Sequence, residues 1–104
     1  MTFVVELSPT AEADLEHLFD FLLDQVETVE DLDRSQAAID SIRAAAMHRL
    51  AIAPFSYRKA ARNPAQRELI IPFGNIGYVA LFEIVSSAKV IVLAVRHQRE
   101  EDYH

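Results

Sequence analysis

The fold is decided by the stretch RELIIPFGNIGYVALFEIVSSAKVIVLAVRH, residues 67–97. Three runs within it are rich in β-branched and aromatic residues, which predicts three strands. The runs span residues 67–73, 78–85 and 90–97. The only two glycines of the chain, Gly74 and Gly77, lie in GNIG between the first two runs, where positive φ permits a tight hairpin. Because SSAK supplies a second turn, the stretch predicts an antiparallel meander.

Upstream of this stretch, TFVVEL at residues 2–7 predicts a first strand. Ser8 can cap a helix and Pro9 suits the first helical position, so a helix is expected from Pro9 to about Glu27. One apolar stripe follows helical spacing along this segment. It comprises Leu15, Leu18, Phe19, Leu22 and Val26, and is widened by Phe21 and Leu23.

A second helix is expected after the break at TVEDLDRS. Asp31 or Asp33 would cap it, alanines favour it, and Pro54 would end it. Two amphipathic helices joined by a short turn form an αα-hairpin. Residues 54–66 are expected to form a linker, with two prolines and the three bases Arg58, Lys59 and Arg62; Arg67 follows directly.

The predicted fold is α+β with the order β-α-α-β-β-β, in a single domain over residues 1–104. The helical hairpin packs on one face of a small antiparallel sheet, and the first strand pairs within that sheet. The middle and last strands of the meander carry apolar residues on both faces, whereas the helices can cover only one. We expect the second face to be a partner surface. The alternative is that long side chains and the linker cover it.

The net charge of −6 is distributed unevenly along the chain. Residues 1–40 carry eleven acids and one base, residues 41–67 carry six bases and no acid, and residues 68–104 carry five acids and three bases. This balance argues against direct nucleic-acid binding, although the middle segment can form a local basic patch. The chain has no cysteine, and we expect neither a secretory signal nor a membrane span. A cytoplasmic protein is predicted.

Motifs of known chemistry are missing from the sequence. The four histidines, His17, His48, His97 and His104, have no metal-ligand spacing, and no phosphate-binding loop or nucleophile elbow is present. We therefore expect no metal, no cofactor and no catalytic residue. Arginine, histidine and tyrosine together can cleave RNA. However, the acids Glu100, Glu101 and Asp102 beside the last arginines would pair with them and repel an RNA backbone.

Three segments carry a family resemblance that covers nearly the whole chain. They are Ser8-Pro9 followed by AEADLEHLFDFL, then RELIIPFGNIGYVALFEI, then VIVLAVRHQREEDYH. Together they resemble the ParE branch of the RelE/ParE toxin superfamily. The resemblance implies the toxin of a type II toxin–antitoxin, or plasmid stabilisation, system. It also implies inhibition of DNA gyrase without hydrolase activity, and neutralisation by a ParD-like ribbon-helix-helix antitoxin in a hetero-oligomer.

Two alternatives remain open. RelE-like members of the superfamily cut mRNA on the ribosome and use a Lys- and Arg-rich surface with a tyrosine; here Arg67, Arg96 and Tyr103 are the nearest candidates. With only two lysines, Lys59 and Lys89, and an acidic balance, the chain departs from that pattern. The second alternative is an inactive, toxin-derived interaction module.

The partner-binding candidates are the arginines and aromatic residues of the linker and the strands. Apolar anchors would supply the affinity for antitoxin or gyrase, and arginines could pair with acids of the antitoxin. The candidates are Arg58, Arg62, Arg67, Tyr78, Phe82, Arg96, His97, Arg99 and Tyr103.

Overall fold

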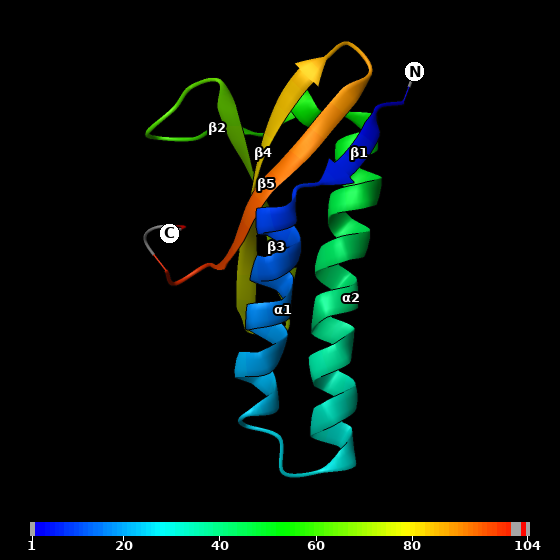
Figure 1. Cartoon of the computed structure of the whole chain (residues 1–104), viewed down its shortest axis with the longest axis vertical. Helices are drawn as coiled ribbons and strands as arrows, with labels where there is room; N and C mark the ends of the chain where they lie inside the picture. Colours follow the sequence, from blue (N-terminus) through cyan, green and yellow to red (C-terminus); the bar gives the residue numbers. More distant parts are fainter. Residues whose placement is uncertain (1, 101–102, 104) are drawn as a thin grey trace.

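The computed structural model describes residues 2–100 and 103. Two helices lie beside a twisted sheet, and the molecule is elongated along the helical hairpin (Figure 1). In chain order, the elements are β1 (Val4–Leu7), α1 (Pro9–Leu23), α2 (Val29–Ile52), a 3₁₀ turn η1 (Pro54–Ser56), β2 (Arg58–Lys59), β3 (Gln66–Phe73), β4 (Ile76–Ser86) and β5 (Lys89–His97).

The sheet has five strands in the order β1-β5-β4-β3-β2. Its β3–β4–β5 meander is antiparallel as predicted, and Gly74 has the positive φ of 59° that the first turn requires. The expectation of a wholly antiparallel sheet was wrong at one edge, because β1 pairs with β5 in parallel. The structure also contains a strand that was not predicted, β2, which is two residues long and lies within the predicted linker.

The helical hairpin is confirmed, with shifted boundaries. Helix α1 ends at Leu23, four residues before the predicted end. Helix α2 begins at Val29 because Thr28 is its N-cap, where its hydroxyl accepts from Asp31 N at 3.1 Å. Asp31 was expected to be a cap itself. Its carboxylate instead accepts from Glu27 N at 3.1 Å, so it fixes the turn between the helices.

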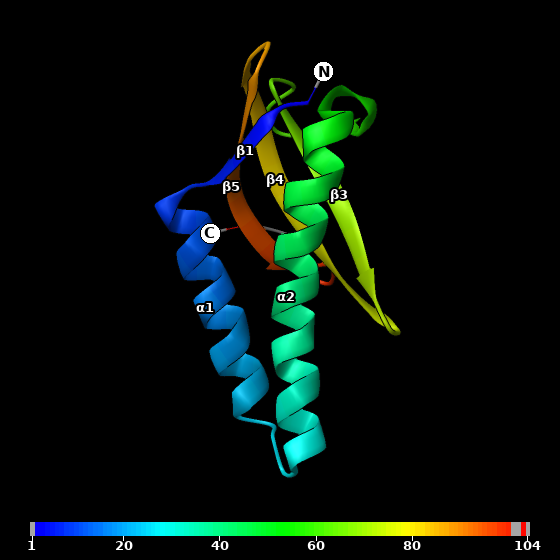
Figure 2. The ribbon, with the colours of Figure 1, turned by 90° about the vertical axis from the view of Figure 1, so that its right-hand side faces the viewer.

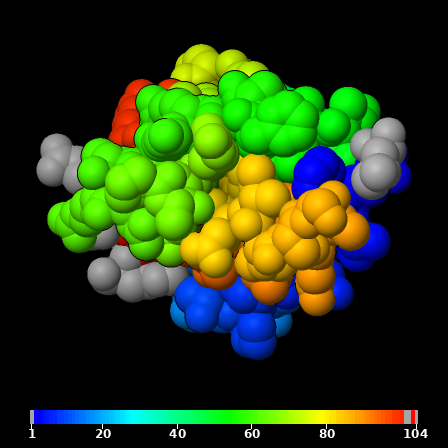
Figure 3. Space-filling model, turned by 90° about the horizontal axis from the view of Figure 1, so that it is seen from above, coloured from blue at the N-terminus to red at the C-terminus, as the bar shows by residue number. Residues whose placement is uncertain are grey.

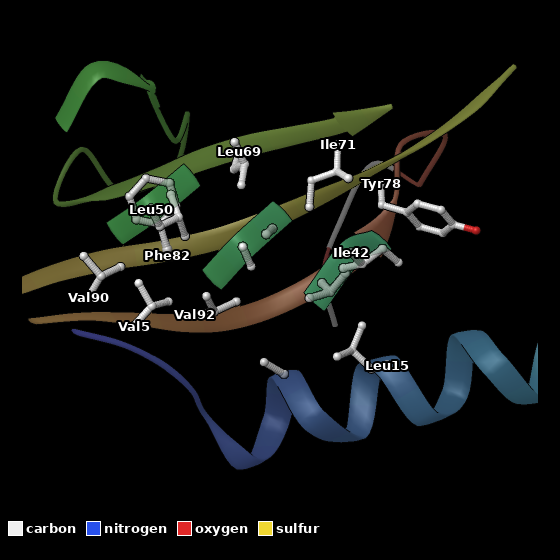
Figure 4. Close-up of a cluster of buried hydrophobic side chains, with 14 of the residues drawn as sticks. Val5, Leu15, Ile42, Leu50, Leu69, Ile71, Tyr78, Phe82, Val90 and Val92 are labelled. Carbon is white, nitrogen blue, oxygen red and sulfur yellow. The ribbon is translucent and has the colours of Figure 1, made fainter. Parts of the chain in front are cut away.

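The helices cover one face of the sheet, and the core lies between the two layers (Figure 2). Figure 4 shows side chains from both helices and from the sheet meeting there. Tyr78 and Phe82 belong to this core, with 1% and 0% of their surface exposed. This burial corrects the expected role of Phe82 as a partner contact, because along β4 the residues of this parity face the helices.

The end of the molecule above the sheet is formed by the linker and the β4–β5 turn, with β1 beside them. Figure 3 shows this end in green, yellow-orange and dark blue, respectively. Phe3 and Phe55 meet here edge to face, with ring centroids 6.4 Å apart. Phe55 nevertheless keeps 61% of its surface exposed.

Helix α1 is attached to β5 where β1 ends. The Ser8 backbone N–H donates to Val92 O at 2.8 Å, and its hydroxyl donates to Leu93 O at 3.0 Å while accepting from Ala11 N at 3.1 Å. One turn further on, the buried carboxylate of Asp14 accepts from Val95 N at 2.9 Å. Side chains of α1 thus satisfy backbone groups of β5 that no strand reaches.

We expect Ser8→Ala to destabilise the fold by about 1–2 kcal/mol, since it removes both the helix cap and the bond to β5. Urea unfolding followed by circular dichroism measures this loss. Thr10→Ala is the control, because Thr10 is exposed on the same first turn. Equal midpoints for the two variants would contradict this role for Ser8.

Candidate interaction surface

Glu68 is the centre of a polar cluster on the sheet face that the helices leave free. The β2–β3 register sets Arg58 opposite Glu68, and Arg58 Nε lies 3.1 Å from Glu68 Oε1. The Tyr103 hydroxyl donates to Glu68 Oε2 at 2.6 Å, and Arg96 Nη2 lies 3.6 Å from the same oxygen. Only 13% of the Glu68 side chain is exposed. One carboxylate therefore joins β2, β3, β5 and Tyr103.

Arg96 organises the turn that follows β5. Its Nη1 donates to the carbonyls of His97 at 3.2 Å and Gln98 at 3.3 Å, and also to that of Glu100. Its guanidinium lies 4.9 Å from the centroid of the Tyr103 ring, a cation–π contact. With 11% of its side chain exposed, Arg96 binds mainly its own chain. In this arrangement it offers little surface to a partner.

The free face of the sheet is not the uncovered apolar surface that was expected. Val79 and Ala94, which have the parity of this face, are buried. The free face carries a hollow of about 310 Å³. It is lined by Arg96 and Tyr103 and by linker residues 60–62, which include Arg62. Long side chains and the linker thus cover the part of this face around Arg96, whereas Val85 further along β4 is 43% exposed.

The environment of Tyr103 raises the pKa of its hydroxyl well above the usual value. Burial is the main cause, and the hydrogen bond to the Glu68 carboxylate acts in the same direction. The positive charge of Arg96 opposes them but is weaker. Tyr103 is therefore held in its neutral, hydrogen-bond-donating form.

A larger cleft of about 690 Å³ lies between α1 and the end of β5. Its lining combines apolar and polar side chains: Asp14, His17, Leu18, Phe21, Gln25, Val95, His97, Arg99, Glu100 and Tyr103. Phe21, which was expected to widen the buried stripe of α1, has 60% of its surface exposed. An exposed aromatic ring beside basic residues is a feature of protein-binding surfaces.

His97 and Arg99 form the strand side of this cleft. The His97 ring packs edge to face on Tyr78, with centroids 5.7 Å apart, and its Nδ1 accepts from Arg99 N at 3.1 Å. His97 N donates to Glu100 Oε1 at 2.9 Å. The turn after β5 thus places His97 and Arg99 together at the cleft.

Beyond the ends of the short strands β1 and β2, the uncovered edges of β5 and β3 are partly occupied. Along β5, the carboxylates of Asp14 and Glu100 occupy Val95 N and His97 N. Along β3, Arg49 Nη1 donates to Ile70 O at 3.1 Å, and Pro72 provides no N–H. A partner is therefore expected to bind through side chains in the cleft rather than by β-augmentation.

Arg67 lies away from the other arginines. It pairs with Phe82 in the β3–β4 register, which places it on the helix-facing side, and its Nη1 donates to Tyr57 O at 2.7 Å. Arg96 pairs with Val79, whose side chain has the opposite parity. The structure brings Arg96 and Tyr103 together but leaves Arg67 on the other face.

Glu68 and the Phe21 cleft were missed by the sequence reasoning. The alternation of Leu69 and Ile71 in the buried strand β3 already implied that Glu68 faces the other way. Its partner Arg58 belongs to β2, a strand of two residues that is too short to show an alternating strand pattern. Phe21 gave no signal, since it continued an apolar run.

Neither a metal site nor a membrane span is found in the part of the chain that the structure describes. No three His, Asp or Glu residues of residues 2–100 and 103 come together to hold an ion. Among the same residues, no helix is long and apolar enough to cross a bilayer.

Comparison with known proteins identifies the family. Residues 5–102 match the family model described as ParE toxin of type II toxin–antitoxin system, parDE. The chain belongs to this family. The resemblance seen in the sequence is thereby confirmed, and the matched range includes every residue of the Glu68 cluster and of the cleft except Tyr103. Curated protein sequences give no match.

A solved structure supports the fold of this ParE family member. It is described as the chromosomal ParDE TA system from P. aeruginosa, and it aligns with a TM-score of 0.72 over 91% of this chain and 95% of that one. The sequences are 15% identical. The likeness therefore concerns the arrangement of two helices on a mostly antiparallel sheet.

The raised pKa of Tyr103 predicts a loss of stability in alkali. A folded-state pKa above the unfolded value contributes stability that is complete below about pH 10 and declines as the pH rises further. Tyr103→Phe should lessen this decline, leaving the part due to Tyr78, whose pKa burial also raises, and should cost about 1 kcal/mol at pH 7 through the lost hydrogen bond. Urea midpoints measured from pH 8 to 11 test this. Parallel curves for the two proteins would show that Tyr103 is not the group responsible.

Proposed function

We propose that this ParE-family toxin inhibits DNA gyrase by binding, and that a ParD-like antitoxin of the ribbon-helix-helix class neutralises it in the cytoplasm. The observation that carries the proposal is the family match over residues 5–102. The toxin would act without catalysing a reaction itself. The fold likeness to a protein described as part of a ParDE system adds support for an antitoxin partner.

The cleft between α1 and β5 is the proposed antitoxin site. Leu18 and Phe21 offer apolar contacts from α1, and Arg99 faces them from the turn after β5. An amphipathic segment of the antitoxin can bury its apolar side on Phe21 and direct an acid towards Arg99. In the hetero-oligomer, this contact would cover the large exposed aromatic ring.

The placement of the basic residues supports a non-catalytic toxin over a ribonuclease. Cleavage of RNA needs a base and cations converging on one phosphate. Arg96 is engaged with carbonyls of its own chain and with Glu68, and Arg67 lies on the opposite side of the sheet. The net charge of −6 also disfavours an RNA partner.

Purified toxin should inhibit gyrase supercoiling of relaxed plasmid, and pre-incubation with the cognate antitoxin should restore it. No inhibition at stoichiometric excess would overturn the gyrase assignment. Primer extension on mRNA after induction provides the contrast, because new cleavage sites would indicate the ribonuclease. Normal growth on induction without antitoxin would instead point to an inactive interaction module.

The cleft is tested by a matched pair of phenylalanine substitutions. Phe21→Asp should weaken antitoxin binding by at least about tenfold, as the loss of an aromatic anchor does. Phe55→Asp is the control, because Phe55 is equally exposed, 61% against 60%, at the other end of the molecule. Calorimetric titration of both variants measures the difference. Equal affinities would place the antitoxin elsewhere.

A further inference from the structure

The second hollow beside α1 contains a buried hydroxyl without a partner. Tyr78 is 1% exposed, and its hydroxyl makes no hydrogen bond within the described part of the chain. In Figure 4, this hydroxyl lies at the end of the ring that points away from the other labelled core side chains. Buried polar groups are nearly always bonded, because an unmet one costs stability. Burial alone raises the pKa of Tyr78, so the group stays neutral.

Tyr78 lines a hollow of about 230 Å³ between the helical hairpin and the β3–β4 turn. This volume is far larger than the roughly 10–15 Å³ that one water needs. Apolar walls come from Leu22 and Val26 of the hairpin and from Phe73 and Ile76 of the sheet. The hollow can therefore enclose the stem of one long side chain while Tyr78 meets its polar end.

The charges around the hollow favour a cation. The acid Asp31 and the base Arg34 both line it, with Arg34 Nη1 3.6 Å from Asp31 Oδ1. The Arg34 side chain is 72% exposed, so this contact is weak. Residues 1–40 carry eleven acids and one base. A basic group entering here is attracted by this field, whereas a carboxylate is repelled.

We propose that this hollow receives a lysine or arginine side chain of the antitoxin, with the Tyr78 oxygen and the Asp31 carboxylate as acceptors. The proposal rests on the proposed function for the identity of the partner. An ammonium has three donors and no acceptor, which matches two acceptors that line one hollow. Gln25 lines this hollow and the cleft that contains Phe21, so one antitoxin segment can reach both.

Two substitutions distinguish the proposal from a hollow that holds only water. Tyr78→Phe should raise the thermal midpoint of the free toxin, because it removes an unpaired buried hydroxyl. The same change should weaken antitoxin binding by about fivefold, the worth of one hydrogen bond of roughly 1 kcal/mol. A lower midpoint for the free variant would overturn the premise that the hydroxyl lacks a partner.

Arg34→Gln gives a test of sign. Removal of this cation frees the Asp31 carboxylate, so an antitoxin that inserts a basic side chain should bind severalfold more tightly. An acidic occupant would bind more weakly, and a neutral one would be unaffected; either result would overturn the proposal. Lys89→Gln is the control, since Lys89 at the start of β5 forms a comparable exposed ion pair with Glu6 of β1 at 3.1 Å.

The class of ligand can be tested on the toxin alone, which separates this inference from the proposed function. n-Butylammonium chloride mimics a lysine side chain, and sodium butyrate is its anionic counterpart. Saturable NMR shifts at Tyr78 and Ile76 are expected with n-butylammonium only, and Tyr78→Phe should weaken them. Shifts with butyrate, or with neither probe, would overturn the proposal. If n-butylammonium binds but the antitoxin does not, the antitoxin is the wrong source of the basic group.

Discussion

Strand β5 crosses the centre of the molecule, and its backbone must be satisfied along its whole length. Strand β1 reaches only its first half. Beyond that point, Ser8 and Asp14 of α1 provide the hydrogen bonds that a longer β1 would have made. These hydrogen bonds to the β5 backbone fix the start of α1 relative to the sheet. They therefore also set the direction in which the helical hairpin runs from the sheet (Figure 2). The space between α1 and the end of β5 follows from this attachment.

The same strand separates two polar regions with different roles. On the free face, Arg96, Tyr103 and Glu68 contact one another, and these contacts keep Tyr103 against the sheet. Beyond the edge of β5, His97 and Arg99 lie by a cleft that contains an exposed aromatic ring. The candidate residues from the end of the chain therefore fall into two sets. Arg96 and Tyr103 contact Glu68 of their own chain, whereas His97 and Arg99 line the cleft.

Much of the layout could be predicted because local chemistry specifies it. The turn at Gly74, the helix start at Ser8 and the stop at Pro54 each depend on one residue and its neighbours. The start of α2 was harder, since Thr28, Asp31 and Asp33 are all good caps. The direction of β1 was not predictable, because pairing at a sheet edge depends on where the helical hairpin returns the chain.

The candidate site was predicted only in part, for related reasons. Tyr78 and Phe82 stand on a strand with apolar residues on both faces, so alternation could not tell which face the helices cover. Arg58, Arg96 and Tyr103 were singled out as partner contacts, whereas in the structure all three bond to Glu68, which no pattern in the sequence groups with them. Contacts across 28 or more positions, as between Glu68 and Arg96, arise from the sheet register rather than from any local pattern.

The uneven distribution of charge has a consequence for the molecule as a whole. Six acids and no base lie between residues 20 and 33, around the tip of the hairpin. The bases Arg58, Lys59 and Arg62 lie towards the opposite end of the long axis (Figure 1). With an extent of 45 Å along that axis, the toxin has a large electric dipole moment. A charged partner would turn it end-on before contact, over a range of about one Debye length, roughly 8 Å in physiological salt.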